Sequence, residues 1–397
     1  MNEKYHVLLL PSWYPEKAGD IGGSFFREQA IALHKEGHKV GVIAPAIRSV
    51  RRLLGIFNKP YGLKFEDDSG VQTYRWHTVN FTPRLHHINK NRYLKIGEYL
   101  FKEYINKNGL PDILHVHSLV NAGFLAFTLS KKYNIPYVVT EHSTAFARGL
   151  VNHEVKHRLE KVVLDSSENI AVSNQFKNLL ESQFDSKKAW KYIPNIVNND
   201  FFEIDLLKKN DAKDFSFINV CLLDHKKRVD ILIRSFSQVF KNNKKIKLKI
   251  GGDGPIRKDL EQLVKDEGIE DQVFFLGLLT REQVRQEMLK ADAFVLSSEY
   301  ETFGVVVIEA LALGKPVIAT RCGGPESIVV PSVGYLVEKN SVHEMASAMQ
   351  HLYENNKYFN PSDIREYCRN SFSEKAVVKK IEKVYKNVLN DRPKHET

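Results

Sequence analysis

Residues 293–319 read AFVLSSEYETFGVVVIEALALGKPVIA, and this stretch decides the fold class. The apolar runs Ala293 to Leu296 and Pro316 to Ala319 have the length and composition of buried strands. Between them a loop ends near Gly304 and a helical segment follows. A strand, a crossover helix and a second strand in this order are typical of a parallel sheet covered by helices.

Short apolar runs alternate with amphipathic stretches along the whole chain, so the sequence predicts an α/β fold. In the first half the predicted strands are His6 to Leu10, Val40 to Ala44, Ile113 to Val116, Tyr137 to Thr140 and Asn169 to Val172, with a helix from about Phe25 to Lys35. In the second half they are Phe217 to Leu223, Ile246 to Gly251, Val273 to Leu276, Ala293 to Leu296 and Pro316 to Ala319.

A chain of 397 residues exceeds the size of one hydrophobic core, so two Rossmann-like domains are expected. The stretch from Asn195 to Asp214 lacks a sustained apolar period and is the predicted junction. The expected domains are residues 1–195 and 196–375, followed by a terminal helix over 376–397, for which a crossing back to the first domain is one alternative. Open parallel sheets bind ligands beyond the carboxyl ends of their strands. The active site is therefore expected in a cleft where the two domains face each other.

Two carboxylates lie eight positions apart at the loop-to-helix junction. If the helix begins near Gly304, Glu309 lies inside it and Glu301 lies before it. The amides of Thr302, Phe303 and Gly304 then lack intrahelical acceptors and favour an anion such as phosphate. Spacing alone favours a second interpretation, a capped helix with one surface Glu and one buried Glu.

This junction resembles the family-4 retaining glycosyltransferases of the double-Rossmann GT-B fold, whose mark is a Glu, seven residues and a second Glu. The second half of the chain matches the family's motifs in order and spacing: Ile250-Gly-Gly-Asp-Gly-Pro255, Phe275-Leu-Gly277, Ala291-Asp-Ala-Phe-Val295, Ala310-Leu-Ala-Leu-Gly-Lys-Pro-Val-Ile318 and Gly323-Gly-Pro-Glu326. The first half is similar at Gly22-Gly-Ser-Phe-Phe-Arg-Glu-Gln29, His115-Val-His117, Thr140-Glu-His142, Ala171-Val-Ser173 and Ile193-Pro-Asn195.

The resemblance implies a role for each matching position. Glu301 holds the hydroxyls of the donor sugar, Glu309 holds the ribose, and His142 orients the sugar. The predicted catalytic residues are Glu301, His142 and Lys227. The predicted donor-binding residues are Gly22, Gly23, Lys227, Arg228, Gly252, Gly254, Leu276, Gly277, Glu301, Thr302, Phe303, Gly304 and Glu309.

Several of these positions have simpler interpretations. Gly22 and Gly23 could form only a turn, and a His at a strand end is often a structural residue. The run Gly251-Gly-Asp-Gly is not a dinucleotide fingerprint, because the third glycine would fall at Arg257. We interpret it as a tight strand-to-helix turn that lines the cleft.

One position departs from the family. Where the family has an arginine and then a lysine that stabilise the departing diphosphate, this chain has Leu222 and Lys227. Arg228 could replace the missing charge, with Lys226 and His225 as further candidates, and a solvated charged loop is the simpler alternative.

The net charge is +10, and residues 1–190 carry 26 Lys+Arg against 18 Asp+Glu. Basic residues gather in two acid-free stretches: Arg48, Arg51, Arg52, Lys59 and Lys64, then Arg75, Arg84, Lys90, Arg92 and Lys95. The chain shows no nucleic-acid-binding signature, so an anionic membrane surface or a phosphorylated acceptor is the expected partner, and no nucleic acid. Three widely spaced cysteines and a first apolar run too short to span a bilayer favour the cytoplasm, with peripheral attachment to the inner face of the membrane as an option.

The predicted function is transfer of a sugar, with retention, from a nucleotide diphosphate sugar to a glycan or lipid-linked acceptor in cell-surface polysaccharide or glycolipid synthesis. A UDP-sugar is favoured over a GDP-sugar as donor. No metal site and no cofactor are expected, because the chain has no Asp-x-Asp and His115 and His117 have no local third ligand. The alternatives are a nucleotide-sugar epimerase of the same architecture and a non-catalytic sugar-nucleotide-binding subunit.

Overall fold

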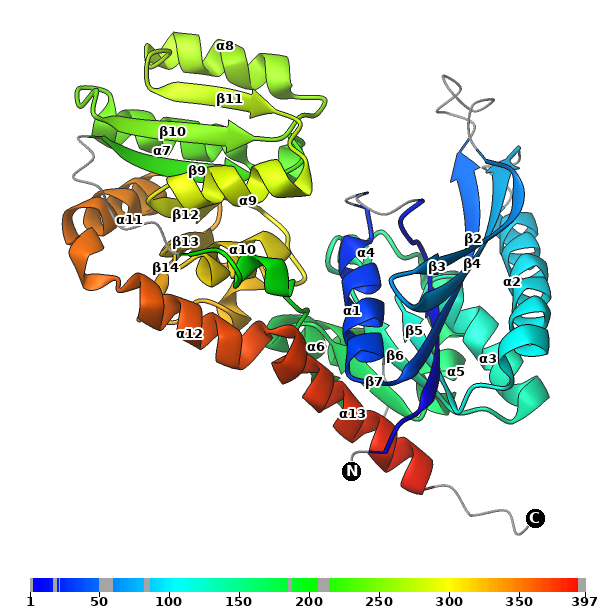
Figure 1. Ribbon diagram of the computed structural model, residues 1–397. Coiled ribbons are helices and arrows are strands. Elements are labelled where there is room, and N and C mark those ends of the chain that lie inside the picture. The colour runs from blue at the N-terminus through cyan, green and yellow to red at the C-terminus, as the bar shows by residue number, and fades with distance from the viewer. Residues whose placement is uncertain are drawn as a thin grey trace. The chain divides into compact units, whose positions relative to one another are not determined.

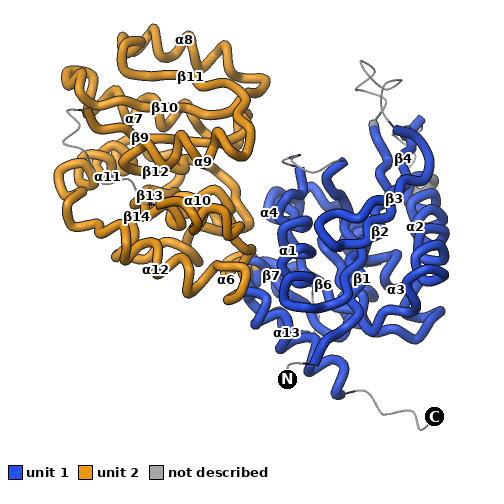
Figure 2. The backbone as a smooth tube through the Cα atoms, viewed as in Figure 1, with its two compact units in different colours: residues 1–172, 177–193, 377–397 blue, residues 173–176, 194–376 orange. Residues whose placement is uncertain are grey.

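The computed structural model describes residues 3–16, 20, 22–49, 60–81, 86–184, 188–205 and 214–391 (Figure 1). The chain forms two compact units, coloured separately in Figure 2. Unit 1 comprises residues 1–172, 177–193 and 377–397, and unit 2 comprises residues 173–176 and 194–376. Helices that fall within the described residues include none that is both long and apolar enough to cross a bilayer.

Unit 1 is built on an eight-stranded sheet in the order β3-β4-β2-β1-β5-β6-β7-β8. All neighbouring strands are parallel except β3 and β4. The strands are β1 (His6–Pro11), β2 (Lys39–Ser49), β3 (Gly62–Asp68), β4 (Val71–Asn80), β5 (Ile113–His117), β6 (Tyr137–Glu141), β7 (Glu168–Ala171) and β8 (Trp190–Tyr192). The central strands β5 and β6 are buried along their whole length, as expected for a parallel sheet covered on both faces.

The hairpin of β3 and β4 was absent from the sequence prediction. Its turn residues Ser69 and Gly70 both have positive φ, 57° and 87°, as in the tight turns that match the twist of a hairpin. Arg75 on β4 is buried, and its guanidinium donates to Glu66 on β3 and to the carbonyl of Pro15. Arg75 was predicted to be part of a basic surface that meets an anionic partner. It is buried, so this part of the prediction is wrong.

The helices of unit 1 are α1 (Ser24–Lys35), α2 (His86–Asn108), α3 (Ala122–Tyr133), α4 (Thr144–Ala147), α5 (His153–Asp165), most of α6 (Asn174–Gln183) and most of α13 (Glu374–Asn390). Helix α3 packs between α2 and α5 (Figure 1). The terminal helix α13 contributes to the core of unit 1, where Tyr385 is fully buried against His115. Glu382, also on α13, shares a hydrogen bond of 2.9 Å with the buried His38.

Unit 2 contains a six-stranded, wholly parallel sheet in the order β11-β10-β9-β12-β13-β14. The strands are β9 (Phe215–Val220), β10 (Ile246–Gly251), β11 (Val273–Gly277), β12 (Ala293–Leu296), β13 (Val317–Thr320) and β14 (Gly334–Val337). This is the doubly wound order, in which the order of the strands reverses between β9 and β12, the first and fourth strands of the unit. The switch point of unit 2 therefore lies between β9 and β12.

The helices of unit 2 are α7 (Val229–Phe240), α8 (Arg257–Glu267), α9 (Arg281–Lys290), α10 (Val305–Ala312), α11 (Val342–Asn355) and α12 (Pro361–Phe372). Residues 173–176, which the sequence assigned to the first domain, belong to unit 2. The reason is a set of short polar contacts: Ser173 Oγ donates to the carbonyl of Gly323 at 3.2 Å, and the amide of Asn174 donates to Ser327 Oγ at 2.9 Å.

Candidate active site

The loops that follow β9 and β12 carry Lys227 and Glu301. Lys227 ends a short 3-10 turn, His225–Lys227, and Glu301 lies five residues beyond the end of β12. Both loops leave the carboxyl ends of the two strands at the switch point, where open parallel sheets bind their ligands. The fold of unit 2 therefore brings together two residues that are 74 positions apart in the sequence.

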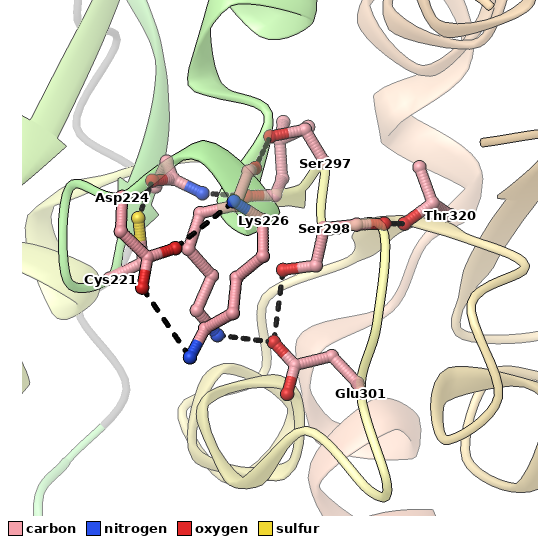
Figure 3. Close-up of polar contacts among 10 residues, drawn as sticks. Cys221, Asp224, Lys226, Ser297, Ser298, Glu301 and Thr320 are labelled. Atoms are coloured by element: carbon pink, nitrogen blue, oxygen red, sulfur yellow. Dashed lines mark hydrogen bonds and ion pairs between the residues drawn. The ribbon is translucent and has the colours of Figure 1, made fainter. Parts of the chain in front are cut away.

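The carboxylate of Glu301 is held by two side chains. Lys227 Nζ donates to Glu301 Oε1 at 2.5 Å, and Ser298 Oγ donates to the same oxygen at 2.9 Å. Figure 3 shows Ser298 and Glu301 pointing toward each other. Burial of Lys227 disfavours its charged form, but the nearby Glu301 carboxylate outweighs burial and holds the pKa of Lys227 above its ordinary value. Both side chains of the pair are largely buried, at 17% and 12% exposure.

Backbone and hydroxyl bonds fix the two loops against each other. The amide of Glu299 donates to the carbonyl of Lys226 at 2.7 Å, and Ser297 Oγ donates to the carbonyl of Lys227 at 2.8 Å. From the next strand, Thr320 Oγ1 donates to the carbonyl of Ser298 at 2.6 Å (Figure 3). These bonds hold Lys227 and Glu301 in place before any ligand arrives, which is the condition for electrostatic preorganisation.

Helix α10 begins after Gly304, as the sequence predicted. Gly304 has a φ of 101°, a left-handed conformation that suits glycine, and no side chain caps the helix. The first turn of α10 also lacks an acidic residue. The helix therefore presents its first amides and the positive end of its dipole just beyond Glu301, an arrangement that favours an anion.

The second glutamate, Glu309, lies inside α10 and is 1% exposed. Arg281, the first residue of α9, donates through Nη1 to Glu309 Oε1 at 2.5 Å. Burial raises the pKa of Glu309, and the Arg281 guanidinium opposes that shift. The Arg281 side chain is 33% exposed, so one end of the pair is buried at Glu309 and the other reaches the protein surface beside α9.

Three predicted glycines lie where loops of unit 2 touch. A Cβ on Gly252 would be 1.8 Å from the carbonyl oxygen of Cys221, and a Cβ on Gly254 would be 2.2 Å from that of Leu223. The amide of Gly252 donates to the carbonyl of Gly277, 2.8 Å away. The loops after β9, β10 and β11 thus pack backbone to backbone, with half-buried Leu276 at the end of β11.

The position that departs from the family motif, Leu222, is 57% exposed. Arg228 does not point to Glu301: its guanidinium donates to both carboxylate oxygens of Asp230, at 3.0 Å each, and to Asn340 Oδ1. Lys226 lies 3.4 Å from an Asp224 carboxylate oxygen. Of these basic side chains, Lys227 is the one that contacts Glu301.

Unit 1 carries the remaining predicted residues. Gly23 precedes α1 with a φ of 83°, and a Cβ there would lie 3.1 Å from the Trp13 ring. A Cβ on Gly22 would meet no atom within 4 Å, so steric crowding does not require glycine at that position. His142, which follows β6, is 6% exposed.

His142 belongs to a column of buried rings. Its Nε2 shares a hydrogen bond of 3.1 Å with His117 Nδ1, and Phe26 packs against both imidazoles. His117 stacks in turn on His115, whose Nδ1 shares a 2.6 Å bond with the Tyr385 hydroxyl.

Burial disfavours the charged forms of His115 and His117. It lowers the pKa of His115 to about 3 and lowers that of His117 well below the ordinary range. Next to the column, the buried Glu141 carboxylate accepts from the amides of Leu119, His142 and Ser143. In the part of the chain that the structure describes, no group of three or more His, Cys, Asp or Glu could hold a metal ion.

Sequence models of two glycosyltransferase families match this chain. The model of Glycosyltransferase Family 4 matches residues 22–201, and that of Glycosyl transferases group 1 matches residues 202–387. The chain belongs to the family-4 glycosyltransferases. The two matched ranges follow each other without a gap and include all the predicted site residues.

Two curated relatives of this family-4 glycosyltransferase are named for the synthesis of different products. The N-acetyl-alpha-D-glucosaminyl L-malate synthase of Bacillus anthracis is 29% identical over 70% of this chain and 76% of its own length. The alpha-monoglucosyldiacylglycerol synthase of Streptococcus pneumoniae is 23% identical over 79% of this chain and 70% of its own length.

The solved structure of Anabaena HepE in complex with UDP and glucose has the same fold. It superposes with a TM-score of 0.72 and 18% identity, covering 96% of this chain and all of that one. The predicted GT-B fold class is therefore confirmed, and so is the activity class, glycosyltransferase.

The sequence did not indicate four contributors to these sites: Arg281, Ser298, His117 as the partner of His142, and Glu141. Arg281 and Ser298 resemble ordinary helix and loop residues, and only the packing of α9 on α10 and the loop after β12 reveals their partners. The His-x-His run was a usable signal, because residues two apart on a strand share one face.

Proposed function

We propose that this family-4 glycosyltransferase transfers a sugar from a UDP-sugar to an anionic or lipid-linked acceptor, with retention at the anomeric carbon. The observation that carries the proposal is the Lys227–Glu301 pair at the switch point of unit 2, followed directly by the uncapped start of α10. A cation, a carboxylate and a row of amides are the groups that a sugar diphosphate needs.

In the proposed step, the bond between the anomeric carbon and the diphosphate oxygen breaks, and the acceptor hydroxyl oxygen bonds to the same face of that carbon. The hydroxyl proton passes to the departing diphosphate. Lys227 and the amides near Phe303 and Gly304 stabilise the negative charge of the diphosphate. Both observed bonds to Glu301 reach Oε1, and we assign Oε2 to the sugar hydroxyls.

Two further groups complete the proposed site. Glu309, paired with Arg281, is assigned to the ribose of the donor, and His142 to the sugar hydroxyls, both by the family resemblance. The preference for a UDP-sugar is supported by HepE, whose structure contains UDP and glucose. No step uses a metal ion, because Lys227 and the amides of α10 supply the positive charge that the diphosphate requires.

The acceptor is proposed to be anionic or lipid-linked, as in polysaccharide or glycolipid synthesis at the cytoplasmic face of a membrane. One relative is named for a glucosyldiacylglycerol product and another for malate, a dianion. In unit 1, Lys64 and Lys95 are exposed and available to an anionic surface. Arg48 instead bonds Glu16 and the carbonyl of Pro60, whereas Arg51, Arg52, Lys59 and Arg84 lie outside the described residues.

A donor screen followed by product analysis tests the proposal. UDP- and GDP-sugars are compared for thermal stabilisation, since a ligand at about a hundred times its dissociation constant adds roughly 2.7 kcal/mol. The stabilising donor is then incubated at length with water or glycerol as acceptor in EDTA. We expect release of UDP and, by NMR, a product with the anomeric configuration of the donor.

Three outcomes would contradict parts of the proposal. An altered nucleotide sugar formed without acceptor would identify an epimerase. Stabilisation without any release of UDP would identify a sugar-nucleotide-binding subunit. Turnover that stops in EDTA and returns with Mg²⁺ or Mn²⁺ would show that a metal ion carries the diphosphate.

A further inference from the structure

A cavity of about 290 Å³, open to solvent on one side, is lined by residues of helices α2, α3 and α5 of unit 1. Figure 1 shows these three helices side by side. Its apolar wall includes Leu94, Phe124 and Val162, one residue from each helix. Lys90, Arg158 and Lys161 line it with their cationic side chains. No described residue that lines the cavity is acidic. None of the residues predicted for glycosyl transfer takes part in it.

Two of the cations converge on one aromatic ring. Lys90 Nζ lies 3.8 Å from the centroid of the Phe124 ring, and the Arg158 guanidinium carbon lies 5.6 Å from the same centroid. Burial, and after it the nearby positive charge of Arg158, lowers the pKa of Lys90. A ring quadrupole attracts a cation but carries no net charge, so it does not neutralise the pair.

Glu154 compensates the charge of Arg158 only weakly, and Glu160 pairs with His157 rather than with a Lys or Arg of the cavity. Glu154 approaches Arg158 no closer than 4.0 Å, and its own side chain is 84% exposed. Such an exposed pair is worth little, because water and salt screen it. Lys161 adds a third, exposed charge from the next turn of α5. The cavity therefore combines an excess of positive charge with an apolar wall.

We propose that this cavity binds an amphiphile whose phosphate monoester lies among Lys90, Arg158 and Lys161 and whose apolar chain packs on Leu94, Phe124 and Val162. Arginine and lysine supply charge-assisted hydrogen bonds to phosphate oxygens. The volume is at the low end of small-ligand pockets, roughly 300 to 1,000 Å³, and suits a headgroup with the first part of its chain. The site goes beyond the proposed function and needs no turnover.

Binding of octyl phosphate, measured by calorimetry at concentrations where it is monomeric, tests both halves of the site. Inorganic phosphate has the negative charge without the alkyl chain, and octyl glucoside has the alkyl chain without the charge. We expect octyl phosphate to bind at least tenfold more tightly than either. Equal affinity for octyl phosphate and inorganic phosphate would overturn the proposal, as would the absence of octyl phosphate binding.

Variants locate the binding. The triple variant Lys90→Gln/Arg158→Gln/Lys161→Gln should lose at least tenfold in affinity for octyl phosphate. The matched control Lys102→Gln/Lys379→Gln/Lys383→Gln removes the same charge from exposed positions of unit 1 and should keep wild-type affinity. Similar losses in both variants would reject the cavity as the site and leave only a general effect of net charge.

Two further measurements protect the result from misfolding and identify the source of the ligand. Lys161→Glu changes one exposed side chain and should weaken octyl phosphate binding at an unchanged melting temperature; unchanged affinity would contradict the proposal. Vesicles containing phosphatidic acid are compared with neutral vesicles. If the wild type and the control variant bind vesicles that contain phosphatidic acid and the triple variant does not, the ligand is a membrane lipid. If the protein binds octyl phosphate but not these vesicles, the ligand is a free amphiphile.

Discussion

Arg281 Nη1 lies 2.5 Å from Glu309 Oε1. The second glutamate of the family motif is therefore buried on α10 together with a cationic partner from α9. The carboxylate is almost completely buried, and a buried carboxylate is tolerated only when it is paired and hydrogen-bonded. The motif therefore depends on a residue 28 positions away that no local pattern connects to it.

Replacing Arg281 alone should lower the free energy of unfolding more than replacing both Arg281 and Glu309. Arg281→Gln leaves an unpaired buried carboxylate and should destabilise the protein by about 3 kcal/mol at neutral pH, the low end for a buried pair because Arg281 is partly exposed. Glu309→Gln keeps the size and hydrogen-bonding capacity of the side chain, and should mainly raise the donor KM with kcat nearly unchanged. The double variant should regain part of the stability that Arg281→Gln loses. Additive losses in urea denaturation would show that the two side chains are not coupled.

The two neighbouring basic residues should separate into a catalytic and a structural role. Lys227→Ala removes the cation that contacts Glu301 and should lower kcat about a hundredfold, the scale of one preorganised charge contact. Arg228→Ala breaks the bonds to Asp230 and Asn340 and should change kcat by no more than a few fold. Leu222→Arg restores the family residue and should raise kcat. Wild-type kinetics for Lys227→Ala would show that the diphosphate binds elsewhere.

The buried His115 predicts acid sensitivity in unit 1. Its pKa of about 3 in the folded state lies below the ordinary value of 6.5. As the pH falls, the unfolded state therefore binds a proton at this residue at a higher pH than the folded state does. The contribution to stability is complete above pH 6.5 and is lost as the pH falls toward 3. The expected slope is about 1.4 kcal/mol per pH unit for this residue. Tryptophan fluorescence reports on unit 1 alone, because Trp13, Trp76 and Trp190 all lie there.

The comparison is made between pH 7 and pH 5 in urea. His115→Gln should lose about 2 kcal/mol less stability across this range than the wild type does. His153→Gln, at an exposed position of the same unit, serves as the control and should follow the wild type. Identical pH profiles for His115→Gln and the wild type would mean that folding does not lower the pKa of His115.

The parts of the fold that follow from local pattern were predictable. The boundaries of β12 and α10 follow from an apolar run of strand length and from Gly304, whose left-handed φ ends the loop. The hairpin of β3 and β4 was missed because its charged residues suggested a solvated tract, although Arg75 is internal and pairs with Glu66 across the two strands.

The site was predictable to the extent that it lies on loops next to the strands. Glu301 and Lys227 could be proposed from motif and position, but their contact depends on the strand order of unit 2, which places β9 beside β12. The bond between His117 and His142 depends in the same way on the pairing of β5 with β6. Long-range pairing of this kind leaves no periodic signal in a single sequence.

The strongest test of the catalytic assignment is Glu301→Gln. The substitution keeps the size of the side chain but removes the charge that pairs with Lys227 and one acceptor for the sugar hydroxyls. Because the loop is also held by the bonds of Glu299 and Ser297, the fold of unit 2 should persist at an unchanged melting temperature. The expected loss in kcat is about a hundredfold, or about 3 kcal/mol of transition-state stabilisation.

Ser298→Ala provides the matched comparison, since it removes one neutral hydrogen bond to the same carboxylate oxygen and leaves the ion pair intact. Its expected cost is about 1 kcal/mol, or less than tenfold in kcat. A graded series, with Ser298→Ala between the wild type and Glu301→Gln, indicates that the carboxylate must be held in place to act. Full turnover by Glu301→Gln would instead support the simpler interpretation, in which Glu301 only precedes a helix.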